Sequence, residues 1–424
     1  MKILLEDVLI VTQNANRDIF EGSILIEDGI IREISKQKID TETDVVISGK
    51  LAALPGFINL HTHVAMSIFK GMADDVSLDK FLEITFALDA KRKEEDIYAG
   101  ALLGIAEMLR SGVTTFVDFY YSEDVIAKAV EKSGIRGVLC WCTLDEQFTT
   151  QKGNPLKNAE KFISDFKDKA LTKPGIAVQG VYVASDETWL KAKEIAEKHG
   201  TVCTYHLAET RKEVYEFMRG KNERPCEHLE KIGFLSKNQI AVHCCYLLRR
   251  EIKMLAEKRV SVAHCPASNM KLASGISPVA PMLEAGVNVG LGTDSNASNN
   301  CLDILREARI AGLLQKVTFA NPALIPAQTI LDMITINAAS ALGMENEIGS
   351  IEVGKKADLV LFNLAHPSLA PADKANIVSG IVYSASQAAI EHVIVDGKIR
   401  IKNGKMEGEQ EIVEAAENAR QRFL

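Results

Sequence analysis

The stretch PGFINLHTHVAMSIFKGMADD, residues 55–75, places two histidines one residue apart where an apolar run ends. On a β-strand, residues i and i+2 point to the same face of the sheet. We therefore expect His61 and His63 to stand side by side at the end of a strand over residues 57–61. Two imidazoles in that position can bind a metal ion, provided that the rest of the chain supplies further ligands.

The middle of the chain alternates apolar strand candidates with helical stretches. Seven further strands are expected, over residues 113–119, 135–142, 176–183, 201–206, 240–244, 260–265 and 287–294. Amphipathic helices are expected over 94–112, 187–200 and 305–317. Eight strands that alternate with helices favour a parallel (β/α)8 barrel of the TIM type, an α/β fold. The alternative is an open, doubly wound parallel sheet.

Both ends of the chain contain short β-strands. Residues 23–34 and 392–404 each carry Asp-Gly between alternating apolar residues, a pattern typical of a two-residue hairpin. Because neither group of strands can bury a face alone, we expect them to pair. The sequence therefore predicts a composite β-sandwich from residues 1–55 and 352–405. It also predicts a barrel domain over residues 56–351 and a C-terminal helix within residues 406–424.

Composition and charge restrict the class of protein. The 424 residues are 47% hydrophobic and 25% charged, with a net charge of -8. An acidic chain of this kind favours neither nucleic acid nor an anionic membrane as a partner. No apolar run approaches the roughly 20 residues of a membrane span. The eight cysteines show no CxxC pair, so we expect reduced thiols and a cytoplasmic protein.

Chemically active side chains gather at the predicted strand ends. His61, His63, His206, His243 and Asp294 all lie there, and barrel active sites form at the C-terminal ends of the strands. Each residue alone has an ordinary explanation, such as a hydrogen-bonded core histidine or, for Asp294, a cap of the next turn. Their joint occurrence favours a site for zinc or ferrous iron with one position free for water.

Glu209 follows His206 by three residues, where the chain leaves its strand. A carboxyl group there can transfer a proton without binding the metal. The alternative is an acidic residue at a helix start, where it is favourable to the helix dipole. The neighbouring ligand candidate favours the catalytic interpretation.

The motifs PGFINLHTH, HLAET, AVHC, HCPASNMKLASGISPV and LGTDSNASNN together resemble the amidohydrolase superfamily over nearly the whole chain. The resemblance is greatest to its mononuclear aminohydrolase branch, which includes S-adenosylhomocysteine/methylthioadenosine deaminases, guanine deaminases and chlorotriazine hydrolases. No lysine ends the strand-four candidate over 176–183, which argues against the dinuclear relatives.

The resemblance implies roles for the residues at the strand ends. One divalent ion, zinc in preference to iron, would be held by His61, His63, His206 and Asp294. His243 and Asp294 would orient and deprotonate the water bound to it, and Glu209 would pass a proton to a ring nitrogen. The implied reaction is hydrolytic deamination of an aromatic aminoheterocycle, with release of ammonia.

Departures from the family pattern restrict the class of substrate that we expect. Adenosine-type members carry a histidine at the end of strand four, where this chain reads VYVASDE. Asp89 is the nearest match to their ribose-binding glutamate. No arginine lies between Arg136 and Arg211 to bind an amino-acid carboxylate, and Trp141 falls about where one would stand. These features favour a methylthioadenosine or deoxyadenosine type of nucleoside over S-adenosylhomocysteine.

Substrate contacts are expected from Asp89, Glu209 and His243, with Trp141 and Phe81 stacking on the ring unless they pack in the core. The alternatives are a guanine, cytosine or pterin-type base deaminase, a chlorotriazine-like hydrolase and a barrel without catalytic activity. We expect the protein to bind a small-molecule substrate. We also expect it to form a homo-oligomer.

Overall fold

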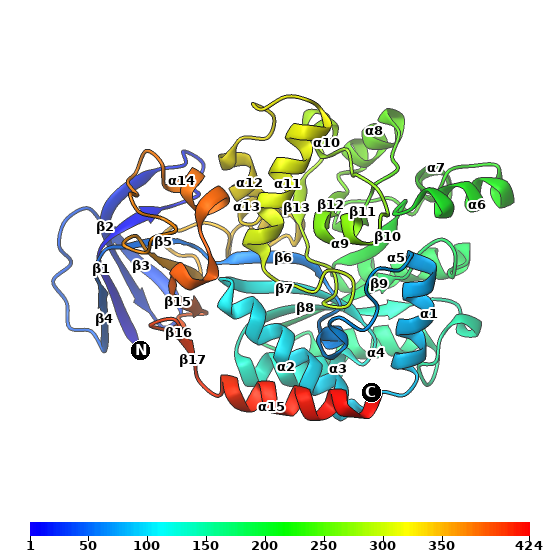
Figure 1. Cartoon of the computed structure of the whole chain (residues 1–424), viewed down its shortest axis with the longest axis horizontal. Helices are drawn as coiled ribbons and strands as arrows, with labels where there is room; N and C mark the ends of the chain where they lie inside the picture. The colour runs from blue at the N-terminus through cyan, green and yellow to red at the C-terminus, as the bar shows by residue number, and fades with distance from the viewer.

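The middle of the chain forms a parallel sheet of eight strands that curves into a barrel (Figure 1). Each strand pairs with the next along the chain. The strands are β6 (Phe57–Thr62), β7 (Val113–Tyr120), β8 (Arg136–Thr143), β9 (Thr172–Val178), β10 (Cys203–Leu207), β11 (Gln239–His243), β12 (Ser261–His264) and β13 (Val289–Leu291). The structure is a computed structural model and describes all residues from 1 to 424.

The first and last strands of this sheet meet at His61. The backbone N–H groups of Thr293 and Asp294 donate to the His61 carbonyl at 3.1 and 2.9 Å. Gly292 permits this approach, because a Cβ atom there would lie 2.7 Å from the Cβ of His61. The barrel expected from the sequence is thus confirmed, and the open-sheet alternative is wrong.

Helices follow most of the strands and cover the outside of the barrel. Those expected over 94–112, 187–200 and 305–317 are confirmed as α2 (Glu94–Arg110), α5 (Asp186–His199) and α11 (Ile304–Thr318). The other barrel helices are α1 (Leu78–Asp89), α3 (Glu123–Ser133), α4 (Pro155–Phe166), α6 (Arg211–Lys221), α7 (Pro225–Lys231), α8 (Arg249–Lys258), α9 (Pro266–Lys271), α10 (Val279–Glu284), α12 (Ala327–Met333) and α13 (Ile336–Ala341). None of the helices combines the length and apolar composition that a membrane crossing requires.

The fourth barrel strand differs from its expected position. It was expected over 176–183, but β9 begins at Thr172 and ends at Val178. Pro174 and Gly175 argue against a strand in the sequence. In the structure, Gly175 is needed there, because a Cβ atom would lie 2.6 Å from the sulfur of Cys140. The earlier end of β9 makes Gln179, rather than Ala184, the residue that follows the strand.

Both ends of the chain form one nine-stranded sheet. Its order is β17-β16-β15-β14-β5-β1-β2-β3, and β4 also pairs with β1. Its strands are β1 (Lys2–Val11), β2 (Ile19–Glu27), β3 (Ile30–Ser35), β4 (Val45–Ser48), β5 (Leu51–Pro55), β14 (Leu359–Asn363), β15 (Ile390–Val395), β16 (Lys398–Lys402) and β17 (Lys405–Met406). Pairing of the two ends and both Asp-Gly hairpins are confirmed, since Glu27 pairs with Ile30 and Val395 pairs with Lys398. The final helix, α15 (Glu409–Arg420), packs along α2.

A buried ion pair joins the terminal sheet to the barrel. Arg136, at the start of β8, is fully buried and pairs with Asp358 immediately before β14. Its second partner is Asp396 at 3.4 Å. Breaking a buried pair leaves an uncompensated charge, which is strongly destabilising.

Arg136→Ala should lower the free energy of unfolding by about 3–5 kcal/mol, because the charge of Asp358 is then buried without a cationic partner. Urea denaturation followed by circular dichroism measures this change. Lys161→Ala, which breaks the exposed pair with Asp165, is the control and should change stability by less than about 1 kcal/mol. Equal losses in the two variants would contradict the role given to Arg136.

Candidate metal centre and active site

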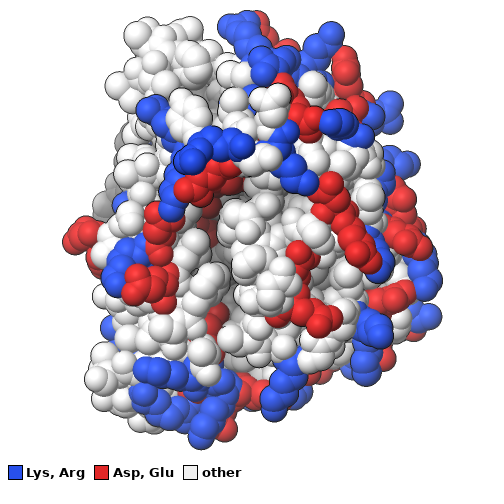
Figure 2. Space-filling model, turned by 90° about the vertical axis from the view of Figure 1, so that its right-hand side faces the viewer, with Lys and Arg blue, Asp and Glu red and all other residues white.

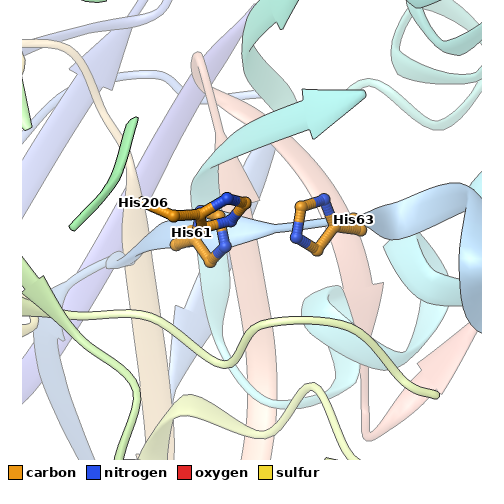
Figure 3. Close-up of side chains that lie close together, drawn as sticks. All are labelled: His61, His63 and His206. Carbon is orange, nitrogen blue, oxygen red and sulfur yellow. The ribbon is translucent and has the colours of Figure 1, made fainter. Parts of the chain in front are cut away.

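Three histidines converge at the C-terminal end of the barrel (Figure 3). His61 lies on β6, His63 follows it, and His206 lies on β10. Each offers a ring nitrogen, and these nitrogens all lie within 4.8 Å of one another. The sequence placed the three at strand ends, and the structure brings them together.

Backbone carbonyls orient two of these imidazoles. Nδ1 of His63 donates to the Phe119 carbonyl, and Nδ1 of His206 donates to the Gln179 carbonyl at 2.8 Å. Nε2 of each ring is therefore the nitrogen with a free lone pair. The Phe119 ring also stacks on His206, with centroids 4.4 Å apart. Such outer contacts fix the tautomer and direction of metal-binding histidines.

The environment of His61 indicates that this group of side chains suits a bound cation. It is fully buried, and neither of its ring nitrogens has a hydrogen-bond partner. Burial lowers the pKa of His61 to about 3, so the ring is neutral and offers a lone pair at neutral pH. An unpaired buried polar group costs free energy, and a metal ion bound to it would remove that cost.

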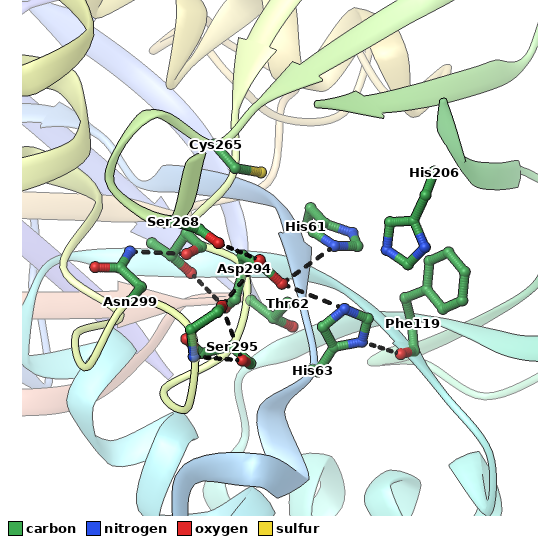
Figure 4. Close-up of polar contacts among 12 residues, drawn as sticks. His61, Thr62, His63, Phe119, His206, Cys265, Ser268, Asp294, Ser295 and Asn299 are labelled. Carbon is green, nitrogen blue, oxygen red and sulfur yellow. Dashed lines mark hydrogen bonds and ion pairs between the residues drawn. The ribbon is translucent and has the colours of Figure 1, made fainter. Parts of the chain in front are cut away.

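Asp294 lies beside the histidines and completes an imidazole–carboxylate set (Figure 4). Its Oδ1 is 3.3 Å from Nε2 of His63 and 3.6 Å from Nε2 of His61. Burial alone would raise the pKa of Asp294, but its contacts with these two histidines outweigh burial and hold it well below its usual range. The residue is therefore an ionised carboxylate that can bind a cation or accept a proton.

Two hydroxyl groups and the backbone fix the direction of Asp294. Its Oδ2 accepts hydrogen bonds from Ser268 at 2.5 Å and Ser298 at 2.9 Å. Its backbone φ is +63°, and that of His243 is +69°, both in the left-handed region. Such strain in non-glycine residues persists only where the surroundings impose it, and it is frequent at active sites.

Glu209 and His243 form a second polar group beside the metal site. Nδ1 of His243 donates to Oδ1 of Asn269 at 2.9 Å, which leaves Nε2 free. That Nε2 lies 3.8 Å from Oε2 of Glu209. The other carboxylate oxygen, Oε1, accepts from Ser274 at 3.0 Å. The carboxylate is thus held at the site and is nearly buried.

A cavity of about 710 Å³ joins these groups. His63, His206, Glu209, His243 and Asp294 form its polar wall. Helix α1 supplies six further lining residues, four of them apolar. Its lining residues are Leu78, Phe81, Leu82, Thr85, Phe86 and Asp89.

A second cavity of about 530 Å³ shares Phe86, Asp89, Tyr121, Cys142 and Gln179 with the first. We call it the side chamber. Its remaining lining residues are Leu144, Phe148, Thr149 and Thr150. Neither cavity is lined by a lysine or an arginine. Figure 2 faces this end of the molecule and shows a narrow hollow flanked largely by uncharged surface.

The residues expected to contact the substrate do not all line the main cavity. Phe81 and Asp89 line the main cavity. Trp141 does not, and instead packs against Phe162 of α4, with ring centroids 5.7 Å apart. Successive residues of a strand point to opposite faces, so Cys142 enters the cavity and its neighbour Trp141 points away from it. The stacking role expected for Trp141 gains no support.

Several residues of the candidate site were not predicted from the sequence. Gln179 lines both cavities, but the fourth strand was expected to end later. Ser268 and Asn269 follow His264 in the stretch HCPASN, and their polar side chains next to a strand end could have indicated them. Phe119 reads in the sequence as an ordinary strand residue. His264 itself is buried and does not line the main cavity.

The chain matches a known protein family. The model of the amidohydrolase family matches residues 52–400. The chain is 42% identical to a 5-methylthioadenosine/S-adenosylhomocysteine deaminase of Thermodesulfovibrio yellowstonii, over 96% of this chain and 95% of that protein. It is 40% identical to a 5'-deoxyadenosine deaminase of Methanothrix thermoacetophila, over 95% of each chain.

A solved structure agrees with these matches. An adenosine deaminase from Xanthomonas campestris with bound zinc superimposes with a TM-score of 0.94 at 30% identity. The match covers 99% of this chain and 98% of the other. The sequence relatives and the shared architecture show that this chain belongs to the amidohydrolase family.

Proposed function

We propose that this protein is a metal-dependent deaminase of adenosine-type nucleosides that carry a small uncharged group at the 5′ position. The observation that carries the proposal is one cavity that joins a histidine–aspartate cluster, a buried glutamate and a side chamber without lysine or arginine. The relatives named as 5'-deoxyadenosine and methylthioadenosine/S-adenosylhomocysteine deaminases support the same substrate class.

His61, His63, His206 and Asp294 would hold one divalent ion in this site. Imidazole and carboxylate suit both zinc and iron, and the zinc bound in the adenosine deaminase relative favours zinc. When bound, such an ion lowers the pKa of a water molecule to about 7, which supplies a nucleophile at neutral pH.

The protein's own side chains would then move the protons. Asp294 accepts a proton from the attacking water, and hydrogen bonds from Ser268 and Ser298 keep its carboxylate directed at the site. Nε2 of His243 faces the same space and can orient that water. Glu209 donates a proton to the ring nitrogen next to the attacked carbon, so negative charge does not accumulate on the ring. The proton taken up by Asp294 then passes to the exocyclic amine, the C–N bond breaks and ammonia leaves, while the hydroxyl proton of the new C–O group returns to Glu209 as the carbonyl forms.

Asp89 is suited to bind sugar hydroxyl groups. Its Oδ2 accepts from the hydroxyl groups of Tyr120 and Tyr121. Nη2 of Arg92 lies 2.9 Å from Oδ1 but is not aligned as a hydrogen bond. Oδ1 is buried beside Arg92, whereas the Asp89 side chain as a whole lines the cavity, where its carboxylate would accept a hydrogen bond from a ligand hydroxyl.

The lining of the side chamber favours an uncharged 5′ substituent over an amino-acid tail. An amino-acid tail needs a charged partner, because burying an unpaired charge is costly. No lysine or arginine lines the chamber, whereas Phe86, Leu144 and Phe148 offer apolar contacts to a methyl or methylthio group. The chamber also provides space that a free base would leave empty.

Ammonia release by the zinc-loaded enzyme tests the proposed function. We expect turnover of 5′-deoxyadenosine and methylthioadenosine, with kcat/KM about 10- to 100-fold lower for S-adenosylhomocysteine, since one hydrogen bond to a charged group contributes about 1.5–3 kcal/mol. Thr150→Arg should reduce this difference by supplying a cation to the chamber. Release from guanine, cytosine or a pterin, with none from nucleosides, would contradict the proposal and indicate a base deaminase. Dechlorination of a chlorotriazine without deamination would point to the other hydrolase class.

Glu209→Gln should depress kcat by ~10²–10⁴-fold, because the amide cannot donate the proton that the carboxylic acid supplies. Its metal content, measured by plasma mass spectrometry, should equal that of the unaltered protein. His206→Ala is the contrasting variant and should lose metal as well as activity. Near-normal turnover of the Glu209→Gln protein would refute the acid role of Glu209.

Asp89→Asn should raise KM for nucleosides by about 10-fold, through loss of a hydrogen bond between a charged acceptor and the sugar. Steady-state kinetics with 5′-deoxyadenosine and with adenine, where adenine is accepted, measure the difference. Tyr215→Phe, an exposed change outside the cavity, serves as the control. If Asp89→Asn leaves the KM of every nucleoside unchanged, Asp89 does not bind the sugar.

A further inference from the structure

Glu213, on the first turn of α6, binds the backbone of the segment that carries Glu209. Its Oε1 accepts from the N–H of Ala208 at 2.9 Å, and its Oε2 accepts from the N–H of Glu209 at 2.8 Å. The Glu213 side chain is half-buried, and its desolvation raises its pKa to about 7. Both of its carboxylate oxygens are thus used to hold two consecutive peptide groups in the turn between β10 and α6.

This arrangement differs from an ordinary helix cap. Thr210 is the N-cap of α6 and accepts from the N–H of Glu213 at 3.1 Å. In a capping box, the glutamate three residues after the cap reaches back to the N–H of the cap residue itself. Glu213 instead reaches the two residues before the cap. A cap alone does not require this longer reach, so it calls for another reason.

The backbone that Glu213 holds is strained. Ala208 has φ of +49°, in the left-handed region that a residue with a Cβ atom rarely adopts. Such a conformation persists only when surrounding contacts impose it. The two hydrogen bonds of Glu213 flank this residue, and they therefore stabilise the turn that sends the chain from His206 toward Glu209.

The direction of the Glu209 side chain depends on that turn. Its Cα position is set by the backbone that Glu213 holds, and its carboxylate is held at the far end by Ser274. Its Oε2 then lies 3.8 Å from Nε2 of His243, beside the cavity. Proton transfer needs an accurate position, since a displacement of roughly 1 Å can cost ~10²-fold in rate.

We propose that Glu213 is a positioning residue that sets the place of the Glu209 carboxyl group for proton transfer. The proposal rests on the proposed function of Glu209 as the acid. Glu213 itself touches neither the cavity nor the reacting atoms, because it does not line either chamber.

Glu213→Gln and Glu213→Ala test the proposal, in the unaltered chain and in the Glu209→Gln background. The glutamine keeps one acceptor oxygen and the shape of the side chain, so it serves if the alanine variant does not fold. Glu216→Gln is the matched control, because Glu216 lies on the same helix with 63% of its side chain exposed. Kinetic constants for ammonia release, metal content and thermal unfolding are measured for each protein.

Glu213→Gln should lower kcat roughly 10- to 100-fold and change KM by less than about threefold, because it affects the reacting geometry and not substrate binding. In the Glu209→Gln background it should lower the residual kcat by less than about twofold, since residues that act through one group are not additive. An equal loss in both backgrounds, or a loss that follows metal content, would overturn the proposal.

A crystal structure of Glu213→Ala supplies a test that does not depend on activity. We expect the Glu209 carboxylate to leave Ser274, whereas in Glu216→Gln it should stay in place. An unmoved carboxylate would overturn the positioning role. Failure of the unaltered enzyme to release ammonia would instead refute the proposed function, and the crystal structure would still decide whether Glu213 positions Glu209.

Discussion

The site depends on the hydrogen bonds that close the barrel at His61. Two successive N–H groups after β13 bind the carbonyl of that residue, so the last strand ends beside the first. This contact brings Asp294 within 3.6 Å of both histidines of the HTH motif, although more than two hundred residues separate them in the chain. The remaining ligand candidate, His206, comes from the middle of the sheet. A doubly wound open sheet would leave its first and last strands apart and could not assemble this cluster.

Neutral hydrogen-bond partners then fix five of the candidate site side chains. Backbone carbonyls hold His63 and His206, Asn269 holds His243, and serine hydroxyl groups hold Asp294 and Glu209. Ring nitrogens and carboxylate oxygens are left facing the cavity, where a cation and a ring can meet them. Preorganised groups of this kind need little reorganisation when charge develops, which is the main source of electrostatic catalysis. His61 is the one member that is buried with no hydrogen bond to either ring nitrogen, and a bound ion would satisfy it.

The sequence located the candidate residues that meet at the barrel mouth better than the residues that line the rest of the cavity. His61, His206, His243 and Asp294 could be found because strand ends in a parallel barrel share one mouth. Gln179 could not, since Pro174 and Gly175 conceal the start of β9 and so displaced its predicted end. For Trp141 the sequence left stacking and core packing open, because the direction of a strand side chain depends on the register; the structure favours packing against Phe162. A 3-10 helix over Val64–Phe69 and a loop separate the HTH motif from α1, so the position of α1 beside the cavity also required the structure.

The central claim is that the cavity supports hydrolytic removal of an amine from a nucleoside base. Incubation with 5′-deoxyadenosine in water enriched in oxygen-18, followed by mass spectrometry of the product, tests it most directly. The account predicts one labelled oxygen on the base, an intact bond between base and sugar, and one ammonia for each product molecule. Release of free adenine, or a deaminated product without label, would contradict it.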